Sequence, residues 1–590
     1  MKMRDLFKNF TNRPVALAIF VALFWLYGAA IITGGFEEIG PDPDDVMRFV
    51  QIRDWMDGQS WFDTNQYRLG LSAGTDMHWS RLPDIPIAIL AWLFGFFTTD
   101  EKALHLASSI FPPLLGAGLL VIFARGADQL AGPKTKHVAR WAVMGLGLVF
   151  VCLGIRFKPG AIDHHNLQTV LILMGYVGLL SLRSFKSGFF AGLALAIALA
   201  IGPEVYPFIA LMGLFVALDW AWSGQTRYAR SLGFGVGFAV GLVFLFILTV
   251  APHEYAKAYC DQLSSVNVLA GMIGGGGLAL SAFFLSQKSL LIRTIVLALI
   301  GIAVLVVVAS IASQCLGNPL NDLPENMHLY WLDHIVEAKS LGVDEPNPLY
   351  VVPFYIGTAC VASFVLIVRV FKKGLTSNRA LMLICLMAAI GLTVYQIRFF
   401  LFTQLFAILP LALWISACYV DGKKRSQNIG YLLATALSLP FILTAPGLLL
   451  KSDVEPKESE ATVDCVGSDV ITALNNLPQS TILAPTSEGS IYLKLTEHHV
   501  LGANYHRNVA GLESTINIYA ADRSEAESLV RADTIDYILI CSEDNQGKLM
   551  KKGYPEGLGA RLADGKNFAW LKPIGQPLSN GGVQIYKVQK

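Results

Sequence analysis

Apolar runs of about 20 residues recur along this chain from Pro14 to Leu450, and short polar segments separate them. A run of this length is sufficient for an α-helix to cross a bilayer. The first run, Pro14 to Gly34, lacks a convincing small-residue cleavage site, so we expect a retained helix rather than a signal peptide. The pattern predicts a polytopic α-helical membrane protein with about 13 transmembrane helices.

The pattern changes near Asp453 and stays mixed to Lys590. We therefore predict two domains, a transmembrane domain over residues 1–450 and a soluble α/β domain over residues 451–590. Periodicity in the second domain predicts a helix over Arg523 to Arg531 and strands over Thr481 to Pro485, His499 to Ala503 and Ile535 to Cys541.

Basic residues set the predicted orientation. Because Lys2, Arg4, Lys8 and Arg13 precede the first run, the N-terminus is expected in the cytoplasm. Asp84 to Phe97 is apolar but short for a span, so we expect it at the interface. The later basic loops then all fall on the cytoplasmic side. This places the loops 35–102, 156–166 and 315–348 and the C-terminal domain outside, in a protein of the cytoplasmic (inner) membrane.

Composition agrees with this class. The chain has 590 residues, of which 54% are hydrophobic and 15% charged. Soluble domains have about 25% charged residues. The net charge of +1 provides no basic surface for a nucleic-acid partner, so we expect none.

Eight cysteines divide between the two environments. Four lie in apolar runs and are expected to pack there: Cys152, Cys360, Cys385 and Cys418. Cys465 and Cys541 lie in the predicted extracytoplasmic domain, where oxidation is allowed, and we predict that they pair. Cys260 and Cys315 both lie near predicted extracytoplasmic loops.

Three carboxylates, Asp42, Asp44 and Asp45, follow the first apolar run within four residues. Pro41 and Pro43 keep the run from continuing as a helix, so we expect the acids on an irregular loop. Hard divalent cations prefer carboxylate oxygens, which makes this loop a candidate metal site. The alternative is a solvated acidic loop that caps a helix.

Further polar groups lie in the other predicted outer loops. Asp163-His164-His165 immediately precedes a span, and Glu337 lies in the long loop 315–348. Arg398 follows the apolar run 381–394 and could bind a phosphate, or could instead extend to the interface. The histidines could equally cap a helix or make structural hydrogen bonds.

In order and predicted sidedness these motifs resemble the GT-C superfamily of membrane glycosyltransferases, most closely the catalytic subunits of oligosaccharyltransferases. In that family the first outer loop has Asp-Pro and an Arg six positions after the Asp, as Asp42, Pro43 and Arg48 do here. Asp163-His164-His165 takes the place of the second acidic motif. Ile335-Val336-Glu337 matches the Ile-x-Glu motif, and Arg398 matches a donor-binding arginine.

Two departures from the family pattern stand out. The acceptor-reading motif Trp-Trp-Asp-Tyr-Gly is replaced by Pro485-Thr486-Ser487-Glu488-Gly489, in which only the Gly is retained. His165 stands where the family has an acid, which exchanges an oxygen ligand for nitrogen and could alter metal preference. We therefore expect a lipid, a glycan or another protein site as acceptor, rather than Asn in a sequon.

The resemblance implies transfer of a sugar or glycan from a polyprenyl-phosphate or polyprenyl-pyrophosphate donor to an extracytoplasmic acceptor, assisted by Mg²⁺ or Mn²⁺. The implied partners are this lipid-linked donor, membrane lipids and a glycan, lipid or protein acceptor. The implied site residues are Asp42, Asp45 and Glu337 as catalytic groups, Arg398 and Arg48 for the donor phosphate, Asp42, Asp163 and His165 for the metal, and Asp44, His164 and Glu488 as acceptor or loop candidates.

Three other functions stay open. An oligosaccharyltransferase acting on protein is a close alternative. A transporter or flippase of lipid-linked glycan would have charges at mid-membrane depth and inverted repeats, whereas the acids of this chain gather in loops. A non-catalytic envelope scaffold would tolerate loss of those acids.

Overall fold

The computed structural model describes residues 13–32, 39–40, 42–180, 183–317, 320, 323–342, 349–425, 428–449 and 463–589. The chain forms two compact units. Unit 1 combines Met1–Ile39, Ser80–Gly317 and Val336–Asp453, and unit 2 combines Gly40–Trp79, Asn318–Ile335 and Val454–Lys590. The predicted boundary near residue 450 therefore marks only the last of the three segments that make up unit 2.

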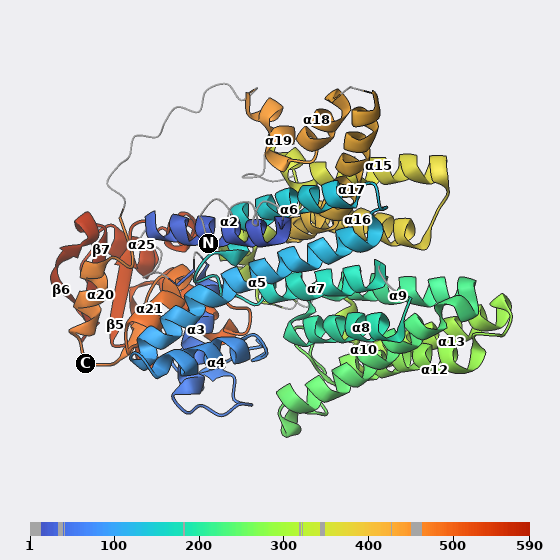
Figure 1. Cartoon of the computed structure of the whole chain (residues 1–590). Coiled ribbons are helices and arrows are strands. Elements are labelled where there is room, and N and C mark those ends of the chain that lie inside the picture. Colours follow the sequence, from blue (N-terminus) through green and yellow to red (C-terminus); the bar gives the residue numbers. More distant parts are fainter. Residues whose placement is uncertain are drawn as a thin grey trace. The chain divides into compact units, whose positions relative to one another are not determined.

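All the regular elements described in unit 1 are helical (Figure 1). The α-helices are α2 (Pro14–Ile32), α4 (Asp84–Gly95), α5 (Asp100–Leu130), α6 (Lys136–Leu153), α7 (His165–Leu180), α8 (Phe185–Ile201), α9 (Tyr206–Ser223), α10 (Tyr228–Thr249), α11 (Ser265–Gly271), α12 (Gly277–Leu285), α13 (Leu290–Ile311), α15 (Thr358–Lys373), α16 (Ser377–Tyr395), α17 (Phe400–Arg425), α18 (Ile429–Ala436) and α19 (Pro440–Leu449).

Within the described residues, 9 helical stretches are long and apolar enough to cross a membrane, or 10 if the bent pair α18 and α19 forms one span. One of these stretches, Pro203–Thr249, has 47 residues and contains both α9 and α10. The helices α4, α7 and α8 are apolar but shorter. The short predicted segment Asp84 to Phe97 is indeed a helix of only 12 residues.

Glycines allow the helices of unit 1 to pack closely. α8 lies against α10, which also contacts α11 and α12 (Figure 1). A Cβ on Gly192 of α8 would stand 2.3 Å from the carbonyl oxygen of Phe234 in α10, so only glycine fits there. A Cβ on Gly271 of α11 would likewise stand 2.3 Å from the side chain of Leu242 in α10, so this glycine also allows close helix packing.

Unit 2 contains all the strands that the structure describes. Its elements are α3 (Pro43–Met56), β1 (Asn65–Gln66), β2 (Thr75–Asp76), α14 (Glu325–Tyr330), α20 (Ser468–Asn475), β3 (Thr481–Leu483), α21 (Gly489–Leu495), β4 (His499–Val500), α22 (Val509–Ala520), α23 (Arg523–Ala532), β5 (Tyr537–Cys541), α24 (Asn545–Gly553), α25 (Leu558–Ala563), β6 (Leu571–Leu578) and β7 (Val583–Val588).

Five strands form a mixed sheet in the order β4-β3-β5-β7-β6. β3 pairs in parallel with β4 and β5, whereas β7 pairs antiparallel with β5 and β6. The three predicted strands and the predicted helix over Arg523 to Arg531 are thus confirmed within a few residues. The antiparallel pair β6 and β7 was not predicted.

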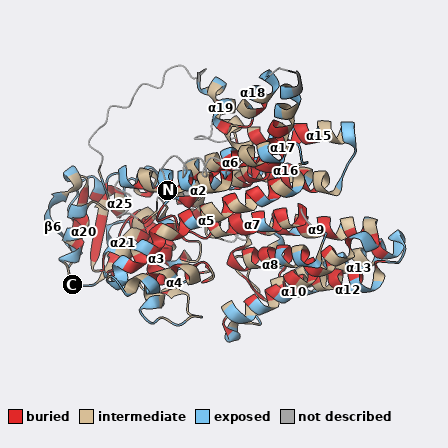
Figure 2. Ribbon diagram, in the orientation of Figure 1, coloured by how far each residue is buried: buried red, intermediate tan, exposed pale blue. Residues whose placement is uncertain are grey.

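Alternate residues of β5 face opposite sides of this sheet, as the two-residue period of a strand requires. Tyr537 and Leu539 face a buried cluster with residues of α3, α20 and α21. Ile538 faces a second buried cluster formed with α14 and α22 to α25. The sheet is therefore covered on both faces, and Figure 2 shows dense burial in α3 and α21.

The segment 40–79 is bound to the sheet by specific hydrogen bonds as well as by apolar packing. Arg68 donates to the carbonyl oxygens of Leu493 (2.7 Å) and Thr496 (2.8 Å). Leu69 forms an isolated parallel bridge to Val500 at the edge strand β4. These bonds join parts of the chain more than four hundred residues apart, so no local sequence pattern could predict them.

Two disulfides are present. Cys465 is bonded to Cys541 within unit 2, which confirms the predicted pairing. Cys260 is bonded to Cys315 within unit 1, a pairing that was not predicted. The four cysteines predicted to pack in apolar runs are free.

Candidate functional site

Asp163 organises a buried polar cluster just before α7 in unit 1. One carboxylate oxygen (Oδ2) lies 3.1 Å from Nη1 of Arg156 and 3.6 Å from Nε2 of His165. The other oxygen (Oδ1) lies 2.7 Å from Nδ1 of His164 and also accepts the backbone N–H of His164. Asp163 and His164 are 3% and 4% exposed, so water contributes little to their charges.

Glu204 completes this cluster from the 3-10 turn η2 (Pro203–Val205), which precedes α9. Its Oε1 lies 3.5 Å from Nε2 of His164, and its Oε2 accepts a 3.2 Å hydrogen bond from Gln168. Gln168 also lies 3.3 Å from Nδ1 of His165. The sequence prediction missed Glu204, although an acid directly after the apolar run of α8 was a usable signal.

Opposite charges decide the protonation of this cluster. Burial by itself lowers the pKa of His164, but the carboxylates of Asp163 and Glu204 raise it to about 10. Burial by itself raises the pKa of Asp163, but the histidines and Arg156 hold it well below its usual range. The cluster therefore contains an ionised Asp163 next to a positively charged His164.

The donor atoms of Asp163, His164 and His165 lie within 4.8 Å of one another, so the three residues could hold a metal ion. Two ligand atoms of a tetrahedral ion stand about 3.4 Å apart when each bond is about 2.1 Å. The 3.6 Å between Asp163 and His165 fits this geometry. Since both nitrogens of His164 face carboxylates, His164 fits the role of a second-layer hydrogen-bond donor better than that of a ligand.

Glu337 and Arg398 form a direct ion pair in unit 1, with Nη2 of Arg398 3.2 Å from Oε1 of Glu337. Glu337 belongs to the turn η9 (Val336–Ala338), and Arg398 belongs to the turn η12 (Ile397–Phe399). The N–H of Ile397 donates to the carbonyl oxygen of Lys339 and holds the turns together. Both charged side chains stay partly exposed, at 51% and 35%, so a ligand can reach them. Their direct contact was not predicted.

The first acidic motif lies in unit 2, where it starts a helix. Asp42 is the N-cap of α3 and accepts the N–H of Asp44 at 3.1 Å, and Pro43 is the first helical residue. The prediction of an irregular loop is therefore wrong for Asp44 and Asp45, which lie in the first turn of α3. An Asp cap followed by Pro is a preferred helix start, and negative charges near it are favoured by the helix dipole.

Asp45 and Arg48 are buried within unit 2, at 2% and 1% exposure. Gly40 has a positive φ of 49°, and a Cβ there would stand 2.1 Å from the carboxylate of Asp45, so glycine is required beside this acid. The guanidinium of Arg48 lies 5.0 Å from the ring centre of Trp79, an aromatic contact that stabilises a cation. Asp42 is only half-buried.

Glu488 ends the turn η13 (Thr486–Glu488), which directly follows β3 in unit 2. Burial raises the pKa of Glu488, and the nearby carboxylates of Asp544 and Asp464 raise it further. Burial also raises the pKa of Asp544, the N-cap of α24. The structure thus places Glu488 in an acidic, partly buried site at the carboxyl ends of β3 and β5.

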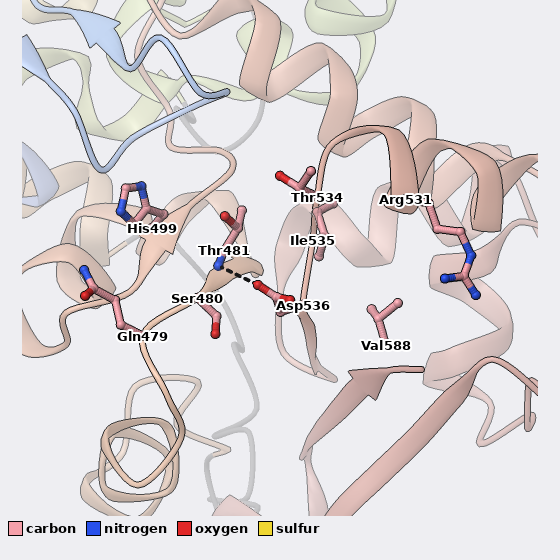
Figure 3. Close-up of a pocket in the computed structure, with 9 residues that line it drawn as sticks. All are labelled: Gln479, Ser480, Thr481, His499, Arg531, Thr534, Ile535, Asp536 and Val588. Carbon is pink, nitrogen blue, oxygen red and sulfur yellow. Dashed lines mark hydrogen bonds between the residues drawn. The ribbon is translucent and has the colours of Figure 1, made fainter. Parts of the chain in front are cut away.

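An open cleft of about 660 Å³ lies at the other end of the same strands (Figure 3). Thr534 on its rim has a positive φ of 55°, which is uncommon for a residue with a branched side chain. None of the predicted site residues lines this cleft. Its lining is mostly polar and consists of Gln479, Ser480, Thr481, His499, Arg531, Thr534, Ile535, Asp536 and Val588.

The sequence matches no family model and no curated protein. The structure, however, resembles solved structures of the oligosaccharyltransferase from Archaeoglobus fulgidus. The structure of AglB in complex with an inhibitory peptide and a dolichol-phosphate superposes with a TM-score of 0.67 at 12% identity, covering 98% of this chain and 74% of that chain. This chain has the fold of AglB.

Two other AglB structures give similar values. The complex with Zn and sulfate has a TM-score of 0.65 at 12% identity, with 95% of this chain and 78% of that chain covered. The structure tethered to an acceptor peptide containing the NVT sequon has a TM-score of 0.63 at 13% identity, with 98% and 74% covered. The likeness to AglB spans the helical unit and the sheet together, which confirms the predicted resemblance to oligosaccharyltransferases.

Within this AglB-like fold, the predicted residues form separate groups. Asp163, His164 and His165 form one cluster, and Glu337 with Arg398 forms a pair, all in unit 1. Asp42, Asp44, Asp45, Arg48 and Glu488 belong to unit 2.

Proposed function

We propose that this protein is a GT-C type membrane glycosyltransferase that transfers a sugar or glycan from a polyprenyl-phosphate or polyprenyl-pyrophosphate donor to an extracytoplasmic acceptor. The Asp163 cluster, within an AglB-like fold, is the observation that carries the proposal. A buried carboxylate flanked by two histidines and an arginine suits a site that binds a cation and a phosphate. AglB structures containing dolichol-phosphate, and Zn with sulfate, support such ligands.

In the proposed reaction, a nucleophilic atom of the acceptor forms a bond to the anomeric carbon of the sugar, with inversion. The bond from that carbon to the phosphate oxygen breaks, and the phosphate leaves with the electron pair. Asp42, which is half-buried at the start of α3, or Asp45, in the first turn of that helix, orients or deprotonates the acceptor. Arg398 binds the leaving phosphate, for which its partly exposed guanidinium is accessible.

Asp163 and His165 would hold the divalent cation, Mg²⁺ or Mn²⁺, with an alternative preference for zinc because His165 supplies nitrogen. A bound cation supplies electrostatic stabilisation of the leaving phosphate. Arg156 and His164 keep Asp163 ionised, which any cation site requires. Arg48 is proposed to act indirectly on the donor phosphate, by fixing α3 through Trp79.

We further propose thirteen membrane crossings in a cytoplasmic membrane, with the N-terminus inside and unit 2 outside. The 47-residue stretch Pro203–Thr249 then crosses twice, as α9 and α10, and the shorter helices α7 and α8 cross once each. The disulfides support this orientation, since both lie in segments that it assigns to the oxidising side.

The proposal has two forms, which differ in the class of acceptor. Glu488, in the segment Pro485 to Gly489, replaces the family's acceptor-reading motif, and this favours an acceptor other than Asn in a sequon. The AglB structure tethered to an acceptor peptide favours a protein acceptor instead. Both forms share the same donor and the same transfer chemistry.

The test is transfer by purified protein from a lipid-linked donor, isolated from cells that lack the protein and identified by mass spectrometry. We expect Asp42→Asn and Asp163→Asn each to lower the rate by about 10²–10³-fold with normal expression. Because both residues are proposed to act in the same transfer step, the double variant should be little slower than either single variant. Asp57→Asn, at the exposed C-terminal end of α3, is the matched control and should retain the wild-type rate.

Wild-type rates in both active-site variants would refute the proposal. A transfer rate that EDTA does not change would refute the requirement for a divalent cation. A sequon peptide, a lipid and a glycan offered as acceptors identify the acceptor class. If no transfer occurs but labelled donor changes leaflet in vesicles, the protein is a flippase instead.

A further inference from the structure

Three arginines are buried together in unit 1, at the end of α9 that lies away from Glu204. Arg227 ends the turn η3 (Gly224–Arg227), Arg230 lies in the first turn of α10, and Arg293 lies in the first turn of α13. They are 6%, 2% and 9% exposed. Since α9 has 18 residues, this cluster lies about 27 Å from the Asp163 site along the helix.

The cluster contains a single carboxylate. Oδ2 of Asp219 accepts from Nε of Arg227 at 2.6 Å, and the same oxygen accepts from Nη2 of Arg230. Arg293 donates to the carbonyl oxygen of Ser286 at 2.9 Å and has no acidic partner among the described residues. Three guanidinium charges are therefore balanced by one carboxylate.

The same arginines have hydrogen-bond donors that lack acceptors. Nη1 of Arg227, Nε of Arg230 and Nε of Arg293 are buried without a hydrogen-bond partner in the described part of the chain. Burying a cation without its counter-charge is unfavourable, so such a surplus favours the binding of an anion. By contrast, Arg140 directs both Nε and Nη2 to the two oxygens of Asp128 and forms a balanced pair.

Arg293 packs closely against the turn that contains Arg227. Gly224, three positions before Arg227, has a φ of 53°, and a Cβ there would stand 1.7 Å from Nη1 of Arg293. Trp220 donates to the hydroxyl of Ser286 at 2.8 Å, which binds α9 to the connection between α12 and α13. The glycine thus makes the space that the guanidinium occupies, next to the turn that ends with Arg227.

The surroundings indicate where an anion would come from. Trp222, at the end of α9, is 78% exposed, as expected for an aromatic side chain at the level of lipid head groups. Gln225 and Thr226, in the same turn η3 as Arg227, are exposed, and exposed Arg183 is close enough to Arg230 to act on its charge.

We infer that Arg227, Arg230 and Arg293 form a binding site for a phosphate anion, supplied by an acidic phospholipid head group or by free phosphate. An arginine guanidinium can pair with two phosphate oxygens at once, so a bound phosphate would supply acceptors for donors that lack them. Basic pockets between helix ends favour acidic lipids for the same reason. The inference depends on unit 1 alone and is independent of the transfer reaction.

The test is native mass spectrometry of the full chain, released from phosphatidylcholine nanodiscs with and without phosphatidylglycerol. We expect the wild type to retain bound phosphatidylglycerol. In Arg227→Gln and Arg293→Gln the affinity of the protein for phosphatidylglycerol should fall by about tenfold or more. Arg293→Lys keeps the positive charge but lacks the planar guanidinium, so it should bind phosphatidylglycerol with intermediate affinity. Arg140→Gln removes an arginine from a balanced pair and should bind as the wild type does.

Inorganic phosphate added to protein in phosphatidylcholine alone tests the second source. A phosphate-dependent rise in the thermal midpoint, absent in Arg227→Gln, would assign the site to free phosphate. Folding of each variant is checked by its elution in size-exclusion chromatography, and Arg293→Lys serves if the glutamine variants aggregate. The inference is refuted if the wild type shows neither phosphatidylglycerol retention nor phosphate stabilisation, or if folded variants bind as well as the wild type.

Discussion

Removal of the disulfide between Cys465 and Cys541 should destabilise unit 2 and leave unit 1 unchanged. The bond joins the segment before α20 to the last residue of β5, across a sequence separation of 76 residues. It therefore closes a loop that contains β3, β4 and most of β5. The double variant Cys465→Ser, Cys541→Ser frees that loop in the unfolded state.

The expected magnitude follows from the loop length. Loop-closure entropy for about 76 residues corresponds to about 4.5 kcal/mol at 25 °C, and measured losses are usually about 2–4 kcal/mol. A domain of 150–250 residues loses about 2–4 °C of its thermal midpoint for each kcal/mol. We therefore expect the midpoint of unit 2 to fall by about 5–15 °C.

The assay is limited proteolysis of the purified full chain over a temperature range, with loss of the intact C-terminal fragment as the readout. Two controls bracket the result. Cys360→Ser removes an exposed free thiol and should change nothing. The double variant of Cys260 and Cys315 opens the disulfide of unit 1 and should leave the midpoint of unit 2 where it is. An unchanged midpoint in the Cys465 and Cys541 variant would refute the loop-entropy reasoning.

Three further outcomes are expected. Arg398→Ala should raise the KM for donor by about tenfold or more, while the thermal midpoint stays nearly constant, because its exposed pair with Glu337 is worth at most about 1 kcal/mol; initial rates against donor concentration would show this. Lys136→Cys, in a background without other accessible thiols, should resist an impermeant thiol reagent in intact cells, and ready labelling would contradict the proposed topology. Glu488→Gln should raise the midpoint of unit 2 more at pH 8 than at pH 4. The folded state favours protonated Glu488, so its ionisation beside Asp544 removes stability as pH rises through the raised pKa, and equal shifts at both pH values would contradict this.

Local patterns were sufficient to predict much of the fold. Apolar run lengths predicted the helices, and alternation predicted β3, β4 and β5, because both depend on neighbouring residues. The order of short motifs also led to the AglB-like fold, although the sequence identity to AglB is only 12%. Asp163, His164 and His165 lie in one cluster, as expected for residues that are adjacent in the chain.

Contacts between distant segments were not predictable in this way. Glu204 meets His164 across two helices, and Glu337 meets Arg398 across α15 and α16. Nothing in the local sequence of Arg48 indicated that it would be buried over Trp79. Such contacts depend on how helices pack, which a single sequence does not specify.

The three-part composition of unit 2 dictates an order of events during synthesis. The ribosome completes residues 40–79 long before residues 463–589 exist, yet the apolar side chains of Met47, Val50 and Leu69 are buried in one cluster with residues of that later segment. An apolar face of the nascent α3 therefore stays exposed while the helices of unit 1 are inserted into the membrane. A chain that stops before β3 leaves this face permanently exposed, so a nonsense mutation late in the coding sequence should impair the earliest loop.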